Sequence, residues 1–232
     1  MDKLPIIKAP SPNYNERRNN AEIDMLVIHY TGMPTSQDAL LRMQQKESEV
    51  SAHYMIDENG EVYQLVEEKY RAWHAGVSFW RGNKDVNSSS IGIELVNKGH
   101  EFGYHNFASL QMKSLITLSK EILNRYNIPQ YNIVGHSDVS PTRKTDPGER
   151  FDWKELHKNG IGLWINEDDT LYKDIDTINF DTSKGLALIG YDISDLEAAI
   201  IAFKRHFMAD YNLTPQIDSK TFFRIFQISH LI

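Results

Sequence analysis

The sequence contains no cysteine. This absence excludes disulfide bonds, metal sites built from thiolates and catalysis by a cysteine nucleophile. It also leaves no cysteine for the attachment of a lipid. A metal ion in this protein would therefore need histidine and carboxylate ligands.

Long apolar runs are also missing, and none approaches the length of a membrane span. The first residues, Met1 to Ser11, are interrupted by Pro5 and Pro10 and lack the apolar region of a signal peptide. We expect either a cytosolic protein or a mature chain from which an export segment has been removed.

Positive charge is in the minority, with 25 lysines and arginines against 32 acidic residues and a net charge of -7. Without a broad basic field to neutralise phosphates, we expect no nucleic-acid partner, and adhesion to anionic lipid is equally disfavoured. A negatively charged substrate would have to meet local cations. The length of 232 residues fits one large domain, or one domain with a small appendage.

One loop, residues 135–148, concentrates groups that can do chemistry. It follows the apolar run 131–134, so it should leave a buried strand, and its two prolines restrict its backbone. Within this loop lie His136, Lys144 and Asp146. We hypothesise that His136 and Asp146 are two ligands of a zinc ion and that Lys144 points into the same site.

A third ligand is needed, because a catalytic zinc site usually has three protein ligands and an open position. Met25 to Ile28 are four consecutive apolar residues and predict an interior strand. His29 follows at its carboxyl end, the edge where open α/β sheets bind ligands. The alternative is that His29 and His136 are packed histidines with no ligand role.

A carboxylate interrupts a second apolar strand, Ile91 to Val96. Burial of Glu94 in such a strand is costly unless the carboxylate is paired or neutral, so it needs a partner or a catalytic task. A buried structural ion pair is the alternative. Gly92 suggests that another part of the backbone approaches closely.

Residues 69–87 form a long loop rich in tryptophan, histidine and arginine. Long loops in compact domains are usually functional. Aromatic rings can stack on sugars and guanidinium groups can bind carboxylates, so we predict one wall of a substrate groove. The alternative is a loop held together by its own aromatic residues.

Four segments occur in a characteristic order: 28–31, 72–76, 91–97 and 135–148. Together they resemble the type 2 family of zinc-dependent N-acetylmuramoyl-L-alanine amidases, peptidoglycan hydrolases related to peptidoglycan recognition proteins. The resemblance covers residues 10–165. It implies an α/β fold with a central mixed β-sheet flanked by helices.

By position, the resemblance implies one Zn²⁺ bound by His29, His136 and Asp146, with Glu94 and Lys144 as the catalytic pair. The implied reaction is hydrolysis of the amide between N-acetylmuramic acid, or its anhydro form, and L-alanine in peptidoglycan or muropeptides. The implied contacts to substrate are Tyr30, Arg71, Trp73, His74 and Arg81.

Two other functions are compatible with the same fold. One is a non-catalytic peptidoglycan-binding module, but such proteins typically lose a zinc ligand, whereas this sequence has all three. The other is a zinc peptidase that cuts within the stem peptide. We expect a monomer with a peptidoglycan or muropeptide substrate, located on the periplasmic side of the bacterial envelope, with the cytoplasm as the alternative.

The sequence predicts three parts: a catalytic domain at 1–165, an acidic linker at 166–184 and a small all-α module at 185–232. Residues 194–208 and 218–228 in the last part are amphipathic at helical spacing. The module resembles small helical peptidoglycan-binding modules. Docking on the main domain and independence are both open.

The remaining pattern predicts mainly scaffold. We expect an extended lead-in with little secondary structure at 1–22. A strand at 50–57 should turn at an Asn-Gly into a second strand at 62–66. Helices are expected from Ser36 and at 107–126 and 151–156.

Overall fold

The computed structural model of the protein describes residues 4–166, 179–208 and 211–232. Its centre is a six-stranded sheet in the order β1-β5-β4-β7-β3-β8. Only the β4 and β5 pair is antiparallel, so the sheet is mixed, as predicted. The strands are β1 (Ile6–Lys8), β3 (Met25–Tyr30), β4 (Tyr54–Ile56), β5 (Val62–Gln64), β7 (Ser90–Leu95) and β8 (Ile133–Gly135).

The interior position predicted for the His29 strand is confirmed. β3 lies between β7 and β8 and is parallel to both. Leu26, Val27 and Ile28 are completely buried, because helices cover both faces of the sheet. An all-apolar strand is what such a doubly covered position requires.

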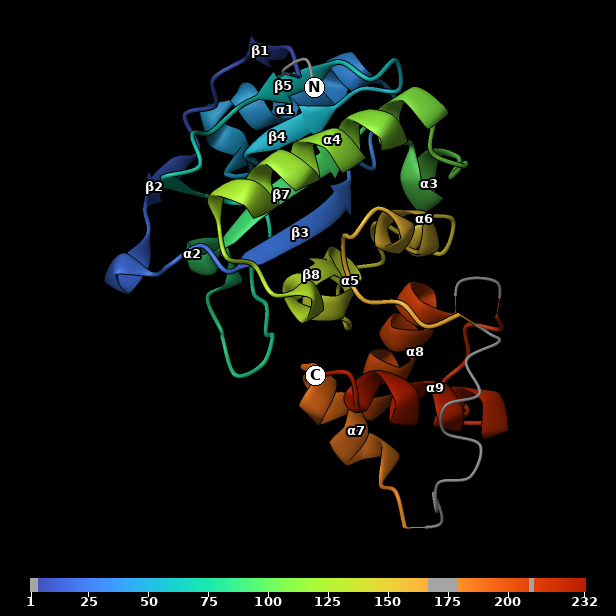
Figure 1. Ribbon diagram of the computed structural model, residues 1–232. Coiled ribbons are helices and arrows are strands. Elements are labelled where there is room, and N and C mark those ends of the chain that lie inside the picture. The colour runs from blue at the N-terminus through green and yellow to red at the C-terminus, as the bar shows by residue number, and fades with distance from the viewer. Residues whose placement is uncertain (1–3, 167–178, 209–210) are drawn as a thin grey trace.

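Helices pack on the two faces of the sheet (Figure 1). α4 (Ser109–Arg125) crosses one face and α1 (Ser36–Gln44) covers the other, which confirms both predicted helices. Thr35 caps α1 by accepting a hydrogen bond from the backbone of Asp38. The shorter helices are α2 (Val86–Ser89), α3 (Gly99–Phe102), α5 (His136–Val139) and α6 (Trp153–Lys158), with 3-10 turns at Arg18–Asn20, Lys46–Ser48 and Gln130–Asn132.

The lead-in is more ordered than the sequence indicates. β1 pairs with β5 at the edge of the main sheet, and β2 (Tyr14–Glu16) pairs with β6 (Tyr70–Ala72) in a separate two-stranded sheet. Both strands have only three residues and an exposed or half-buried surface. Their sequences therefore carry no clear apolar alternation to reveal them.

The predicted hairpin is present, but its first strand is shorter than expected. β4 begins only at Tyr54. Before it, the Ser51 amide donates to the Trp73 carbonyl and the His53 amide to the Gly92 carbonyl, while the His53 carbonyl still accepts from the Leu65 amide. The turn closes through the Asp57 amide, which donates to the Glu61 carbonyl. The strand predicted at 50–57 is thus wrong in its first part.

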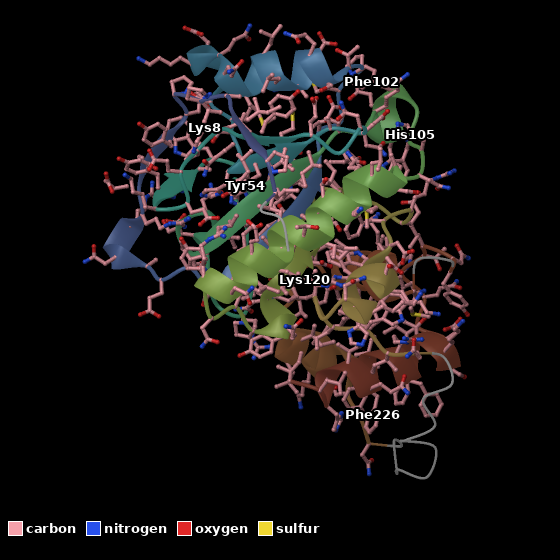
Figure 2. The ribbon with its side chains drawn as sticks, turned by 45° about the horizontal axis from the view of Figure 1, so that its top comes forward. Lys8, Tyr54, Phe102, His105, Lys120 and Phe226 are labelled. Carbon is pink, nitrogen blue, oxygen red and sulfur yellow. The ribbon has the colours of Figure 1, made fainter. Side chains whose placement is uncertain are left out.

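The C-terminal helices are α7 (Thr182–Ile189), α8 (Leu196–Phe207) and α9 (Ser219–Ser229). In Figure 2, Phe226 marks this group, which lies at the end of the molecule opposite Lys8 of β1. α7 begins inside the predicted linker, and residues 167–178 of that linker lie outside the described residues. The division of the chain into three parts stays a prediction.

These helices share a hydrophobic core with the sheet. Val27 of β3 and Val134 of β8 belong to the same cluster of buried side chains as Leu186, Phe203 and Ile225 from the three C-terminal helices. The C-terminal region is therefore packed on the main domain. Within the described residues, no helix combines the length and the apolar character needed to cross a membrane.

Candidate metal centre

The register of the sheet brings the predicted site residues together. Across the parallel strands β3 and β7, His29 is the direct neighbour of Glu94. On the other side of β3, Ile28 is opposite Gly135, so that His136 follows immediately at the start of α5. Neighbours in register point to the same face. The carboxyl edge of three adjacent strands thus presents all three side chains.

Three ligand atoms converge at this edge. The Nδ1 atoms of His29 and His136 are 2.9 Å apart. The Oδ2 atom of Asp146 lies 3.1 Å from the first and 3.0 Å from the second. All three side chains are buried. Among the described residues, they form the one group of three histidine or acidic side chains that converges this closely.

The contact of His136 with a backbone carbonyl shows which of its ring nitrogens carries a proton. Its Nε2 lies 3.1 Å from the carbonyl oxygen of Ala75, which can only accept a hydrogen bond. Nε2 therefore carries the proton. In a neutral imidazole this leaves a lone pair on Nδ1, directed at the other two ligand atoms.

The protonation of His29 is determined by a chain of hydrogen bonds that ends on a carbonyl. The Val86 carbonyl can only accept, so the Ser90 hydroxyl donates to it at 2.6 Å. Ser90 Oγ then accepts from Nε2 of His74 at 3.0 Å. His74 Nδ1 in turn accepts from Nε2 of His29 at 3.0 Å. The Nδ1 atom of His29 is thus left with a lone pair.

Burial and neighbouring groups keep His29 neutral and Asp146 ionised, which are the forms that bind a metal. Burial, followed by the neighbouring His136, lowers the pKa of His29 to about 4, so its imidazole is neutral. Burial alone would raise the pKa of Asp146, but His136 and His29 lower it below its ordinary range. The carboxyl group is therefore ionised.

With both imidazoles neutral and protonated on Nε2, Nδ1 of His29, Nδ1 of His136 and Oδ2 of Asp146 present three lone pairs to one another. Such contacts are repulsive unless a cation lies among them. A tetrahedral ion with bonds of about 2.0–2.1 Å would hold its ligand atoms about 3.3 Å apart, close to the spacing observed. His29, His136 and Asp146 therefore form a site that fits a metal ion.

Glu94 lies beside this site without a partner of its own. Its Oε2 is buried and has no hydrogen-bond partner among the described residues, although part of the side chain reaches solvent. Burial, followed by the charge of Asp146, raises the pKa of Glu94 to about 8, whereas the ammonium group of Lys144 acts in the opposite direction. The structural ion pair considered above is absent from the described contacts of Glu94, and its catalytic role stays a prediction.

The sequence profile of N-acetylmuramoyl-L-alanine amidases matches residues 19–149, a range that includes the three candidate metal ligands, Glu94 and Lys144. The chain belongs to this family. Escherichia coli (strain K12) AmiD, an N-acetylmuramoyl-L-alanine amidase, is 36% identical over 217 residues, which are 80% of this chain and 75% of AmiD.

The amidase is also similar to AmpD and to a solved complex of AmiD. The 1,6-anhydro-N-acetylmuramyl-L-alanine amidase AmpD of Haemophilus influenzae is 38% identical over 162 residues, 62% of this chain and 86% of AmpD. The solved complex of E. coli AmiD with the substrate anhydro-N-acetylmuramic acid-L-Ala-D-gamma-Glu-L-Lys has a TM-score of 0.79 and 31% identity, and covers 94% of this chain and 98% of that one.

Two of the predicted substrate contacts, Tyr30 and Trp73, are partly exposed. Tyr30 follows His29, and its hydroxyl lies 3.0 Å from both His100 Nδ1 and Thr145 Oγ1. Trp73 follows β6, and its indole donates to Asn15 Oδ1. Binding of substrate by either residue stays a prediction.

The other three predicted contacts, Arg71, Arg81 and His74, also have partners within the chain, and binding of substrate by them stays a prediction. The Arg71 guanidinium pairs with Asp85 at 2.8 Å. The Arg81 guanidinium donates to the carbonyl groups of α7, at 2.7 Å from Leu188 O. His74 is buried in the hydrogen-bond chain that ends on Val86, so it orients the metal ligand His29. These contacts give each residue a structural role that sequence reasoning did not assign.

The close approach inferred at Gly92 involves a side chain and not another backbone. A Cβ atom on Gly92 would lie 2.5 Å from the ring of His74. Glycine is therefore needed for His74 to reach His29. His53 is also buried, and its Nδ1 accepts a hydrogen bond from the Gly92 amide.

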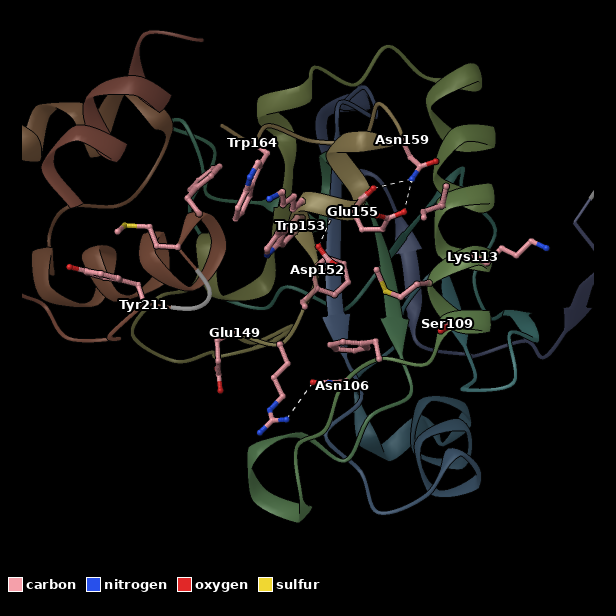
Figure 3. A pocket seen from close by; sticks show the side chains of 18 of the residues that line it. Asn106, Ser109, Lys113, Glu149, Asp152, Trp153, Glu155, Asn159, Trp164 and Tyr211 are labelled. Atoms are coloured by element: carbon pink, nitrogen blue, oxygen red, sulfur yellow. Dashed lines mark hydrogen bonds between the residues drawn. The ribbon is translucent and has the colours of Figure 1, made fainter. Parts of the chain in front are cut away.

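A cavity of about 1030 Å³ lies elsewhere in the amidase, between α4, α6 and the C-terminal helices. Figure 3 shows Ser109 of α4 on one side of it, Tyr211 on the other and Trp153 between them. Neither the metal-binding residues nor Glu94 lines it. The cavity marks the junction with the C-terminal helices and is separate from the metal centre.

Sequence reasoning missed two buried residues that organise the site. Ser90 joins His74 to the Val86 carbonyl in the hydrogen-bond chain from His29, and Asp138 lies two residues after His136 with its side chain completely buried. The one available signal was that each is a polar residue next to an apolar strand. That signal does not reveal the partners, which come from distant parts of the chain.

Proposed function

We propose that this amidase is a zinc enzyme that hydrolyses the amide between the lactyl group of N-acetylmuramic acid, or its anhydro form, and L-alanine. The observation that supports this most strongly is the convergence of Nδ1 of His29, Nδ1 of His136 and Oδ2 of Asp146, three possible ligand atoms that lie 2.9–3.1 Å from one another. Imidazole and carboxylate ligands suit zinc, which commonly leaves one position open in catalytic sites.

Zinc bound there supplies a Lewis acid that polarises the scissile carbonyl group and activates water. Glu94 is the proposed general base, because it is the neighbour of His29 in register and has a buried oxygen free of hydrogen bonds. It accepts a proton from the attacking water and passes it to the departing nitrogen.

Lys144 is the proposed donor to the oxyanion. It precedes Asp146 by two residues, is half-buried, and its ammonium group influences the pKa of both Glu94 and His29. A cation at this position stabilises negative charge as it develops on the scissile carbonyl oxygen. Loss of one such donor typically raises the barrier by about 2.7–4 kcal/mol.

The proposed substrate is peptidoglycan or a muropeptide derived from it. The AmiD complex contains the anhydro-muramoyl tripeptide as its substrate, and that structure covers nearly the whole of this chain. We propose that Tyr30 and Trp73, both partly exposed, contact this substrate. We also propose the periplasmic side of the bacterial envelope as the location, with the cytoplasm as the alternative, and a monomeric state.

The second candidate is a peptidoglycan-binding module without catalysis. It is disfavoured because the metal-binding residues, Glu94 and Lys144 are all present and oriented to one face. The experiment that separates the two is mass spectrometry of products from intact sacculi and from a purified anhydro-muropeptide. We expect free stem peptides beginning with L-alanine, and binding of the muropeptide without cleavage would reject the enzyme.

A further inference from the structure

We infer that the C-terminal helices position the metal centre, through a buried cluster that connects them to the short helix carrying His136. This inference rests on the proposed zinc site. The cluster, called the Asp138 cluster below, consists of the side chains of Asp138, Tyr191 and His206 and the amide of Gly135.

Asp138 is the centre of the cluster. Its Oδ1 accepts a hydrogen bond from the Tyr191 hydroxyl at 2.7 Å. Its Oδ2 accepts one from Nδ1 of His206 and one from the Gly135 amide, both at 2.7 Å. All three side chains are buried. Two of the three donors to this carboxylate therefore come from the C-terminal region.

The helix that carries Asp138 depends on such contacts. α5 has only four residues, from His136 to Val139, and a single helical turn has little stability of its own. Its first residue is the metal ligand His136. The position of the His136 Nδ1 atom is therefore determined by what holds α5 in place, and the carboxylate of Asp138 is bound one turn away.

The donor His206 is itself held rigidly. Its ring stacks on Trp153 with centroids 3.8 Å apart and on Phe207 at 3.9 Å. Tyr191 packs edge-on against Trp80 at 5.1 Å. Both donors are thus fixed by aromatic packing, so they can hold the Asp138 carboxylate in one geometry.

The same helices also hold the loop that carries the second contact to His136. Arg81, in the loop 69–87, donates to the Leu188 and Ile189 carbonyl groups of α7. That loop supplies the Ala75 carbonyl, which accepts from Nε2 of His136. The C-terminal region is therefore hydrogen-bonded both to α5, which carries His136, and to the loop that contacts His136 Nε2. A module that served only to bind glycan would not need these bonds.

The test is zinc affinity in the full-length chain, measured by competition with a fluorescent chelator well below the melting temperature of each variant. Tyr191→Phe removes one donor hydroxyl, and His206→Phe removes the other donor but keeps the stacked ring. Each should weaken zinc binding by about 10-fold, the lower end of the range for groups behind a metal ligand. His206→Asn, which keeps a donor near the Nδ1 position, should restore most of the affinity.

A matched control is available in the same region. The Tyr211 hydroxyl also donates to a carboxylate, that of Asp218, in an exposed contact, so Tyr211→Phe loses the same kind of bond away from α5. It should bind zinc as the parent does. Tyr191→Phe loses no ring and should fold even where His206→Phe does not.

The inference is overturned if Tyr191→Phe and His206→Phe melt at lower temperatures but hold zinc as tightly as the parent and Tyr211→Phe. The Asp138 cluster would then stabilise the fold only. A parent protein that binds no zinc is a different result, because it rejects the proposed zinc site itself.

Discussion

Replacement of Glu94 by glutamine should make the metal-free protein more stable, and the gain should grow with pH. The folded protein raises the pKa of this carboxyl from an ordinary value of 4.5 to about 8, because burial and the charge of Asp146 disfavour ionisation. Between these two values the folded protein retains a proton that the unfolded chain has released. Folding stability therefore falls as pH rises through this window.

The size of the effect follows from the same values. Each unit of pKa corresponds to about 1.36 kcal/mol, so the limit for a change from 4.5 to about 8 is about 5 kcal/mol. Part of the Glu94 side chain reaches solvent, which reduces the penalty, and we expect about 2–3 kcal/mol at pH 8. Well below pH 4.5 the carboxyl is protonated in both states and its contribution vanishes.

The assay is urea unfolding of parent and Glu94→Gln in the presence of a chelator, at several pH values from 4.5 to 8. Buried histidines such as His29 and His53, whose pKa values are lowered to about 4 and about 3, titrate in both proteins and cancel in the difference. The exposed Glu67→Gln serves as the control for the loss of a carboxylate. A difference between parent and Glu94→Gln that stays constant over the whole range would refute the account of Glu94 as a buried, unpaired acid.

Four further results are expected. Glu94→Ala should retain the metal and lose most of its turnover, whereas unchanged activity would exclude its role as base; the measurement is metal content together with kcat. Lys144→Met should lower kcat by about 10²–10³-fold at unchanged zinc content, and a change confined to KM would indicate binding of substrate instead. Ser90→Ala and His74→Phe should weaken zinc binding by about 10–100-fold, because the proton on Nε2 of His29 is no longer directed, and chelator competition measures this. Removal of the metal should abolish hydrolysis of an anhydro-muropeptide until zinc is restored, and activity that survives exhaustive chelation would contradict the mechanism.

Much of the metal centre could be predicted from the sequence, because it depends on strand ends. The apolar run before His29 and the one before His136 identify two buried strands, and parallel strands place their carboxyl ends at one edge. Glu94 could be predicted for a similar reason, since a carboxylate in an apolar strand needs an explanation. The family resemblance then supplied the roles.

The supporting hydrogen bonds could not be predicted, because they join residues without a shared local pattern. His74 lies in a loop with no periodicity, and only the structure shows that its ring covers Gly92 and reaches His29. Arg81 was predicted to face substrate, but its partner Leu188 is 107 residues away. Charge and aromatic content identify such a loop without indicating which way each side chain points.

The C-terminal helices show the same limit. Their amphipathic pattern predicted α8 and α9 but not the surface they cover. α7 was missed, since it follows an acidic stretch and begins inside the predicted linker. His206 lies on the apolar face of α8 between aromatic residues, and its partner Asp138 is 68 residues earlier. A hydrophobic helix face predicts that its residues are buried, but only the folded structure shows which residue His206 contacts.

The central claim is tested most directly by diffraction at the zinc absorption edge from crystals of the zinc-loaded protein. We predict one anomalous peak about 2.0–2.1 Å from Nδ1 of His29, Nδ1 of His136 and Oδ2 of Asp146, with Nε2 of both histidines directed away from the ion. An ion bound through Nε2, or a peak only at another part of the molecule, would contradict the account.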